Sequence, residues 1–336
     1  MTVAAAPSLK TLLSRWENGH SVPEPQYRDL LAELYGRSAG ELGLSLATGP
    51  ESAAERSLAA ALAAASAGGD RARQLWQQQL VLARELDDTT GAAGSGALVT
   101  ALVERLADTL LHTVPAAART ELAAVLSAAA ALAGDQALDL VRPDRAWRHY
   151  DQARQAAREA ELPGAAAVAT VGLATTLIEV GEPGSAVQLL SQSPAPPAHV
   201  QARLQLAMAL ARAAAGEPEP SRAAVTAAAR ALRATPVDIV DRRDAPPVEL
   251  SDLHRWQGRV LVELADPGAI APLEQALAAG SRSTRQRAAV HADLALALRG
   301  EQPQRATEHA RSARELAAGI GSERIPARLA RWGGAG

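Results

Sequence analysis

The stretch from Gly172 to Leu190 reads GLATTLIEVGEPGSAVQLL, and it contains the local pattern from which we infer the fold. An apolar run reaches Val180 and meets Gly181, Pro183 follows two residues later, and a second apolar run begins. Apolar residues at spacings of three and four are typical of helices, whereas Gly tends to end a helix and Pro to begin one. The stretch therefore predicts two helices joined by a tight turn.

The same landmark returns three times further along the chain. Helices are predicted to end at Gly181, at Gly216, near Ala265 and at Gly300, each followed by a proline within three residues, at intervals of 35, 49 and 35. The longer interval contains an apparent insertion over residues 235–249. A period of about 34 residues with a helix–turn–helix unit is typical of tetratricopeptide-like repeats. We therefore expect an all-α fold with an α-α superhelix over residues 141–332; helical hairpins without a true repeat are the alternative.

Small residues mark where each predicted hairpin must close. Ala174, Ala209 and Gly258 lie seven positions before the first three landmarks, whereas Asp293 occupies this position in the fourth unit. Leu190 has the spacing expected for the apolar face of the second helix in the first unit. Repeats of this kind bury their faces only against their neighbours, so an inner groove that holds a peptide or a partner helix is expected.

The composition excludes several classes of protein. The chain of 336 residues has no Cys, no Phe, 2% aromatic residues and a formal net charge of −3. Disulfide frameworks, Cys-ligated zinc, uniformly basic nucleic-acid coats and base-stacking platforms are therefore not expected. The 80 alanines favour many close helix–helix contacts over one large aromatic core.

Neither a membrane span nor a signal peptide is expected. The longest uncharged stretch, Leu162–Ile178, has 17 residues and is interrupted by Pro and Gly. Residues 1–7 contain neither a basic region nor a long apolar core. We expect a soluble, cytoplasmic protein.

Further helices are predicted upstream of the repeats. They cover residues 57–66, 71–86, 97–114, 116–133 and 144–162, with a loop over residues 87–96 and an end of the fourth helix at Gly134. From these patterns we predict three parts: a partial DNA-binding domain at 1–46, connector hairpins at 47–140 and the repeat domain at 141–332.

The N-terminal segment predicts two short helices. Ser8 is a suitable cap for a helix to about Asn18, and Gly19 ends it. A second helix is expected from Tyr27 to Tyr35, with Gly36 as its stop, and residues 37–44 would form one more turn.

The block from Ser14 to Gly19, SRWENG, followed by Pro23 and a leucine-rich helix, resembles the recognition helix and the next helix of Xre/Cro-like helix-turn-helix domains. Residues 133–160 and 320–329 are similar to the C-terminal region of actinobacterial regulators that join such a domain to tetratricopeptide-like repeats. The resemblance implies a transcriptional regulator and covers most of the chain.

The resemblance also implies which residues meet DNA. The recognition helix of this family lies in the major groove, so Lys10, Thr11 and Arg15 would meet base edges and Asn18 and His20 would meet phosphates. These residue types fit the chemistry, because Lys and Arg reach guanine acceptors whereas Asn and His donate to phosphates.

The printed chain departs from the family in two respects. Only residues 1–7 precede Ser8, where the family has two further helices, and residues 8–44 have four basic and five acidic side chains. A net charge of −1 is a poor footprint for a phosphate binder. Two interpretations stay open: the start of the domain lies upstream, or the segment is a remnant with weakened DNA binding.

The sequence contains no motif for catalysis or metal binding. The seven His residues form no metal-ligand pattern, the glycines at 91–96 precede no phosphate-binding Lys, and no nucleophile elbow is present. We therefore expect neither an enzyme nor a bound cofactor or metal.

Aromatic residues at two predicted helix starts are candidates for lining the groove. They are Trp147, Tyr150, His254 and Trp256, although core packing is the commoner role for such side chains. The cluster SRSTRQR at 281–287 contains Arg282, Arg285 and Arg287, for which a solvated face is a simpler interpretation than an anion site.

Two hypotheses follow from the sequence. The first is a DNA-associated regulator whose repeats bind a peptide or protein partner or form a homodimer. The second is an interaction scaffold that has lost autonomous DNA binding. Neither hypothesis requires a membrane.

Overall fold

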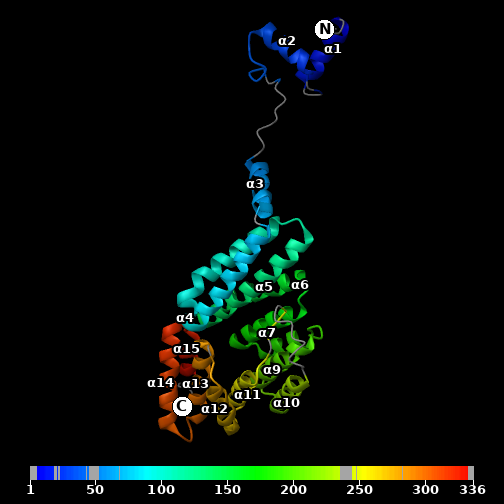
Figure 1. The fold of residues 1–336 in the computed structure, drawn as a ribbon. Coiled ribbons are helices and arrows are strands. Elements are labelled where there is room, and N and C mark those ends of the chain that lie inside the picture. The colour runs from blue at the N-terminus through cyan, green and yellow to red at the C-terminus, as the bar shows by residue number, and fades with distance from the viewer. Residues whose placement is uncertain are drawn as a thin grey trace. The chain divides into compact units, whose positions relative to one another are not determined.

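The computed structural model describes residues 6–18, 21, 23–42, 44, 53–67, 69–234, 244–246, 248–281 and 283–331. All regular structure in these ranges is helical, which confirms the predicted all-α class (Figure 1). The chain groups into two compact units, Met1–Ala64 and Ala65–Gly336. The division into three parts at 1–46, 47–140 and 141–332 stays a prediction.

The first unit contains α1 (Ala6–Glu17), α2 (Pro25–Tyr35) and most of α3 (Ala53–Ala67). Pro25 begins α2, and Gly36 ends it with φ 61°. The Trp16 and Tyr27 rings lie 5.3 Å apart between their centroids, so an aromatic contact joins α1 to α2. Both predicted N-terminal helices are therefore present, each beginning two residues earlier than expected.

The second unit is a succession of helical hairpins. Its helices are α4 (Gly69–His112), α5 (Ala116–Asp139), α6 (Pro143–Glu159), α7 (Pro163–Glu179), α8 (Pro183–Ser191), α9 (Ala198–Ala214), α10 (Pro218–Ala234), α11 (Leu250–Glu263), η2 (Pro267–Ala269), α12 (Ile270–Ala279), α13 (Thr284–Leu298), α14 (Pro303–Ile320) and α15 (Arg324–Arg331).

The predicted turns lie between these helices, three of them as left-handed joints and the fourth, at Gly300, between α13 and α14 without a left-handed backbone. Gly181 (φ 84°), Gly216 (φ 76°) and Ala265 (φ 50°) have left-handed backbones just after α7, α9 and α11. A proline begins each following element, because its missing N–H is one that the first turn of a helix leaves without a partner. The same joint occurs twice upstream, with Val141 (φ 53°) and Glu161 (φ 57°) in place of Gly, and we did not predict it there.

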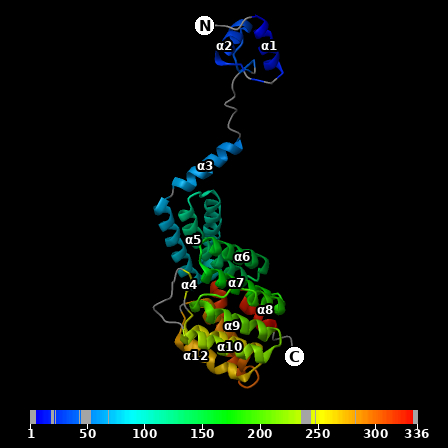
Figure 2. The same ribbon diagram turned by 90° about the vertical axis from the view of Figure 1, so that its right-hand side faces the viewer.

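The helices of this unit pack in two layers. In one layer α5, α7, α9, α11, α13 and α15 each contact the next, and α15 also contacts α5, so the layer closes into a ring. The helices α6, α8, α10, α12 and α14 each pack against neighbours in this ring. The red C-terminal helices consequently lie beside the end of the cyan helix α4, which α14 contacts (Figures 1 and 2).

A single residue divides α4. Gly91 has φ 57° and ψ −152°, which separates helical segments 69–90 and 92–112. The chain reverses there, since the Ser95 hydroxyl donates to the Asp87 carboxylate at 3.3 Å across eight residues. A Cβ added to Gly91 would lie 2.6 Å from the Ile320 Cβ in α14, so glycine is required by both backbone conformation and close packing. The predicted loop over 87–96 is thus too long.

The predicted end of a helix at Gly134 is wrong. Gly134 lies inside α5, which continues to Asp139, and the glycine is buried. A Cβ at this position would lie 2.7 Å from the Tyr150 ring of α6. The glycine therefore leaves room for an aromatic side chain and does not stop the helix.

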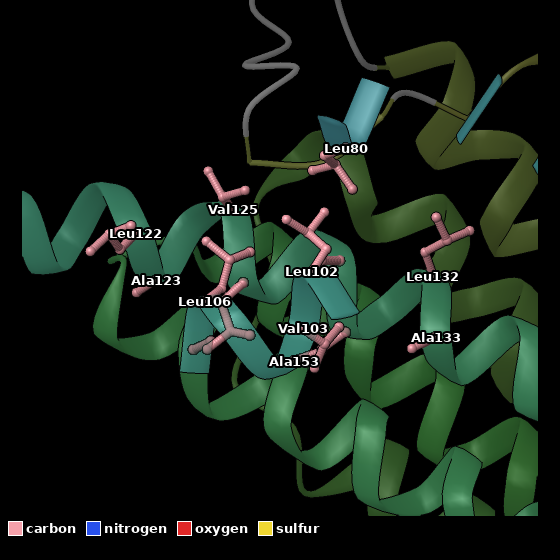
Figure 3. Close-up of a cluster of buried hydrophobic side chains, with 14 of the residues drawn as sticks. Leu80, Leu102, Val103, Leu106, Leu122, Ala123, Val125, Leu132, Ala133 and Ala153 are labelled. Carbon is pink, nitrogen blue, oxygen red and sulfur yellow. The ribbon is translucent and has the colours of Figure 1, made fainter. Parts of the chain in front are cut away.

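The core is built from Ala, Leu and Val side chains. Its largest cluster joins α4, α5 and α6, and Figure 3 shows Leu102, Leu106 and Val125 gathered between the ribbons. Small residues close the hairpins as predicted: Ala174 and Ala209 are fully buried, and a Cβ at Gly258 would lie 2.4 Å from Leu273. Because the helices approach one another closely, small alanine side chains are enough to fill the space between them.

The insertion between α10 and α11 stabilises a distant helix. Residues 235–243 and 247 lie outside the described part, but Asp244 is buried. Its carboxylate accepts hydrogen bonds from the Gly164 and Ala165 amides at 2.7 and 3.0 Å, which caps α7. His199 Nε2 lies 3.4 Å from the same carboxyl group.

Of the described helices, α5 alone is long and apolar enough to cross a bilayer. Half of its most apolar window is buried, and α5 packs against α4 and α6, as a core helix of a globular protein does. A membrane protein is therefore not indicated by the described residues.

Candidate functional site

The ring of helices in the second unit lines an open cavity of about 430 Å³. Its wall consists of residues from α4 and α6 and from every helix of the ring, α5, α7, α9, α11, α13 and α15. Cavities of this size are typical of small-ligand sites, and the region between packed helices is a common place for them. This cavity is the candidate functional site.

Charged side chains dominate the wall of the cavity. Seven arginines and five aspartates line it: Arg84, Arg203, Arg255, Arg259, Arg285, Arg324 and Arg328, with Asp87, Asp88, Asp135, Asp139 and Asp293. Charges are rarely buried unless they are paired or hydrogen-bonded, so the pairing of each group shows what the site can still bind.

Arg285 on α13 pairs with two carboxylates from the other side of the ring. Its Nη1 and Nη2 donate to Asp87 of α4 at 2.6 and 3.0 Å, and its Nε donates to Asp139 of α5. Burial opposes the charge, but Asp139 and Asp87 hold the pKa of Arg285 above its ordinary value. The interpretation of residues 281–287 as a solvated face is therefore wrong for Arg285. Arg287 is exposed and donates to the Thr284 hydroxyl at 3.1 Å, and Arg282 lies outside the described residues.

Helix α15 is attached to the ring by two further arginines. Arg324 donates to Glu179 of α7 from Nη2 at 2.5 Å and from Nε at 3.0 Å, and Arg328 contacts Asp293 of α13. Arg259 of α11 approaches Asp293 at 3.5 Å. These ion pairs join helices that are far apart in sequence, and they hold α15 against α7 and α13.

Two carboxyl groups of the cavity wall have raised pKa values. Burial raises the pKa of Asp293 to about 7, although Arg259 and Arg255 act in the opposite direction. Burial likewise raises the pKa of Asp135, against the effect of Arg285 and of the Tyr150 hydroxyl, which donates to it at 2.5 Å. A raised pKa means that these two carboxyl groups take up a proton more readily than an aspartate in water does.

Tyr150 is held in a slot made by two glycines. A Cβ at Gly134 of α5 would lie 2.7 Å from its ring, and a Cβ at Gly172 of α7 would lie 2.3 Å from it. Burial is the main cause that raises the pKa of Tyr150, and the neighbouring Asp135 adds to it. The hydroxyl therefore stays protonated and acts as a donor.

A second cavity of about 410 Å³ shares part of this wall. It is lined by the turns at Val141 and Gly181 and by Arg259, Arg324 and Arg328, which also line the first cavity. The arginine pairs of α15 therefore form the boundary between the two cavities.

The predicted groove residues divide into two pairs. Tyr150 and Trp256 line the cavity, and Tyr150 is buried in its slot. Trp147 is 39% exposed, and neither it nor His254 is among the residues that line the cavity. The arginines at 203, 255, 324 and 328 were missed; their signal is a charged residue on the otherwise apolar inner face of a helix.

The predicted DNA-binding residues lie on or just after α1 of the first unit. Lys10, Thr11, Arg15 and Asn18 are exposed, and the Asn18 amide donates to the Ser14 carbonyl at 2.7 Å. His20 lies outside the described residues.

In the described part of the chain, no group of three or more His, Cys, Asp or Glu residues is arranged to hold a metal ion. Comparison with protein families, with curated proteins and with solved structures found no match.

Proposed function

We propose that this chain is a DNA-associated transcriptional regulator whose helical hairpins bind a peptide or a segment of a protein partner. The observation that carries the proposal is the charged cavity inside the ring of α5, α7, α9, α11, α13 and α15. A ring of stacked hairpins suits ligand sensing, because a ligand that contacts several helices at once changes their relative stability. The proposal assigns no reaction to the chain.

The recurring joint of a left-handed residue followed by proline supports tetratricopeptide-like hairpins arranged as an α-α superhelix. In the first unit, the contact between the Trp16 and Tyr27 rings joins the two helices that resemble a helix-turn-helix segment, which supports that resemblance. The exposure of Lys10 and Arg15 on α1 leaves both side chains accessible to a duplex.

A selection experiment tests the DNA-binding half of the proposal. The full chain is incubated with a pool of random duplexes at fixed salt, and the retained sequences are compared with those retained by R15A. We expect an enriched motif whose affinity falls by about 1–3 kcal/mol in R15A, as for loss of a guanine contact. R233Q is the matched control, because this arginine lies on α10, far along the chain.

The second candidate function is an interaction scaffold without autonomous DNA binding. It is favoured by the net charge of −1 over residues 8–44. Failure to enrich any duplex motif, together with capture of a crosslinked partner or a homodimer by light scattering, would select the scaffold over the regulator.

A further inference from the structure

The arginines of the cavity wall differ in how they are paired. Arg285, Arg324 and Arg328 contact carboxylates on other helices of the unit. Arg203 of α9 and Arg255 of α11 make no such contact within the described residues. These two arginines therefore differ from the other three in lacking a carboxylate partner on another helix.

Each of these two side chains has a buried donor without an acceptor. Arg203 Nη2 donates to the Pro246 carbonyl at 3.3 Å, and Arg255 Nη2 donates to Asp252 on its own helix at 3.1 Å. The Nε atoms of Arg203 and Arg255 are both buried and have no hydrogen-bond partner among the described residues. A buried donor without a partner is costly, so such groups call for an explanation.

The two guanidinium groups also act on each other. Burial lowers the pKa of Arg203, and the like charge of Arg255 lowers it further, while Asp252 opposes both effects. Asp252 is already engaged, since its other carboxylate oxygen lies 3.3 Å from the Glu249 amide. Asp135 also favours the charge of Arg203, and Arg255 acts on Asp293, but Asp252 is the carboxylate that one of the two guanidinium groups contacts directly.

The surroundings indicate what would join them. A carboxylate has two acceptor oxygens and matches the planar donors of arginine in a bidentate geometry. The Arg255 guanidinium lies 5.7 Å from the centre of the Trp256 ring, and Val171 and Leu210 contribute apolar surface to the same cavity. The site thus combines a positively charged end that suits an anion with an apolar wall.

We propose that Arg203 and Arg255 bind the carboxylate of a peptide, at its C-terminus or on an acidic side chain, with an adjacent apolar side chain against Trp256. This inference rests on the proposed peptide-binding function and names the ligand chemistry. The excess of arginine over aspartate around the cavity supports it, because a cationic wall attracts anions.

The test uses the full chain and a random tetrapeptide library prepared in two forms, with a free C-terminus and with a C-terminal amide. Retained peptides are identified by mass spectrometry after rapid gel filtration. The variants are R203Q and R255Q, with R222Q as the control. Arg222 lies on α10 outside the cavity, where it forms exposed ion pairs with Glu219 and Asp266. Inorganic phosphate is titrated separately by calorimetry.

We expect retention of free-carboxylate or acidic peptides that carry an apolar residue, and at least a tenfold loss in R203Q and R255Q but not in R222Q. The thermal midpoint of the two ligand-site variants should stay close to that of the parent, because each loses a buried Nε donor that has no acceptor together with only one hydrogen bond; a merely structural arginine would lower it.

Three results would overturn the inference. Neutral amide peptides retained as well as acidic ones would refute the carboxylate pole while leaving peptide binding intact. If R203Q and R255Q retain the peptides as well as the parent chain does, the carboxylate binds elsewhere. Binding of phosphate without retention of any peptide would assign the anion to another source and would refute the peptide-binding function as well.

Discussion

The replacement of Arg285 by Gln is the sharpest test of how the ring is closed. Arg285 pairs α13 with Asp87 of α4 and Asp139 of α5, and the two carboxylate side chains are only 3% and 5% exposed. Gln is shorter and uncharged, so R285Q leaves two buried carboxylates without their cation. Breaking a buried ion pair by removing one partner costs about 3–5 kcal/mol.

The expected loss is large enough to measure as a thermal or urea transition. For a compact unit such as Ala65–Gly336, each kcal/mol corresponds to roughly 2–4 °C, so the midpoint should fall by about 6–20 °C. Equilibrium urea unfolding followed by circular dichroism gives the free energy directly. The control is R287Q on the same helix, whose guanidinium bonds only Thr284 within the described residues; it should cost about 1 kcal/mol or less.

The double variant D87N/R285Q separates the charge effect from the loss of packing. If unpaired buried charge is the cause, removal of one carboxylate should restore part of the stability lost in R285Q. A loss below about 1 kcal/mol in R285Q, or no recovery in the double variant, would refute the closure of the ring by this ion pair.

Three further predictions concern positions outside this pair. D244A removes the acceptor for the first amides of α7 and should lower the urea unfolding free energy by about 0.5–2 kcal/mol; an unchanged value would remove Asp244 from the cap. G172A should destabilise the fold because its methyl group enters the tyrosine slot, whereas G184A in α8 meets open space and should stabilise by roughly 0.5–1 kcal/mol; equal midpoints for the two would contradict the slot. His291 and His309, with Nδ1 atoms 2.9 Å apart, both have pKa values lowered mainly by burial, so the unfolded chain binds more protons below about pH 6.5 and stability should be lost as the pH falls from 7 towards 5; the variant with Gln at both positions should show a flatter profile, and an identical profile would refute the pair as the source.

The joints at Gly181, Gly216 and Ala265 could be predicted because each depends on residues close together in sequence, whereas those at Val141 and Glu161 were not predicted. Gly181 followed by Pro183 stops one helix and begins the next through its own backbone preferences, and the structure places a turn there. Gly134 shows the limit of this reasoning. A glycine in a helical pattern serves as a stop or as space for a neighbour, and only the position of Tyr150 decides which.

The candidate site was predicted less well, because it is assembled by contacts across the ring. Trp256 and Tyr150 attracted attention as rare aromatic residues, and both line the cavity. Arg285 was interpreted as solvated since the sequence does not reveal that Asp87 lies opposite it, 198 positions away.

The sequence by itself determined the helical class, the joints and the alanine-rich packing, since helix propensity, Gly and Pro chemistry and apolar spacing act over a few residues. Only the tertiary structure decided that the hairpins close on themselves, that α15 contacts α5, and that arginines and aspartates from distant helices share one cavity. The physical reason is that a buried charge is stabilised by whichever opposite charge folding brings near it, and that distance is fixed by the ring as a whole.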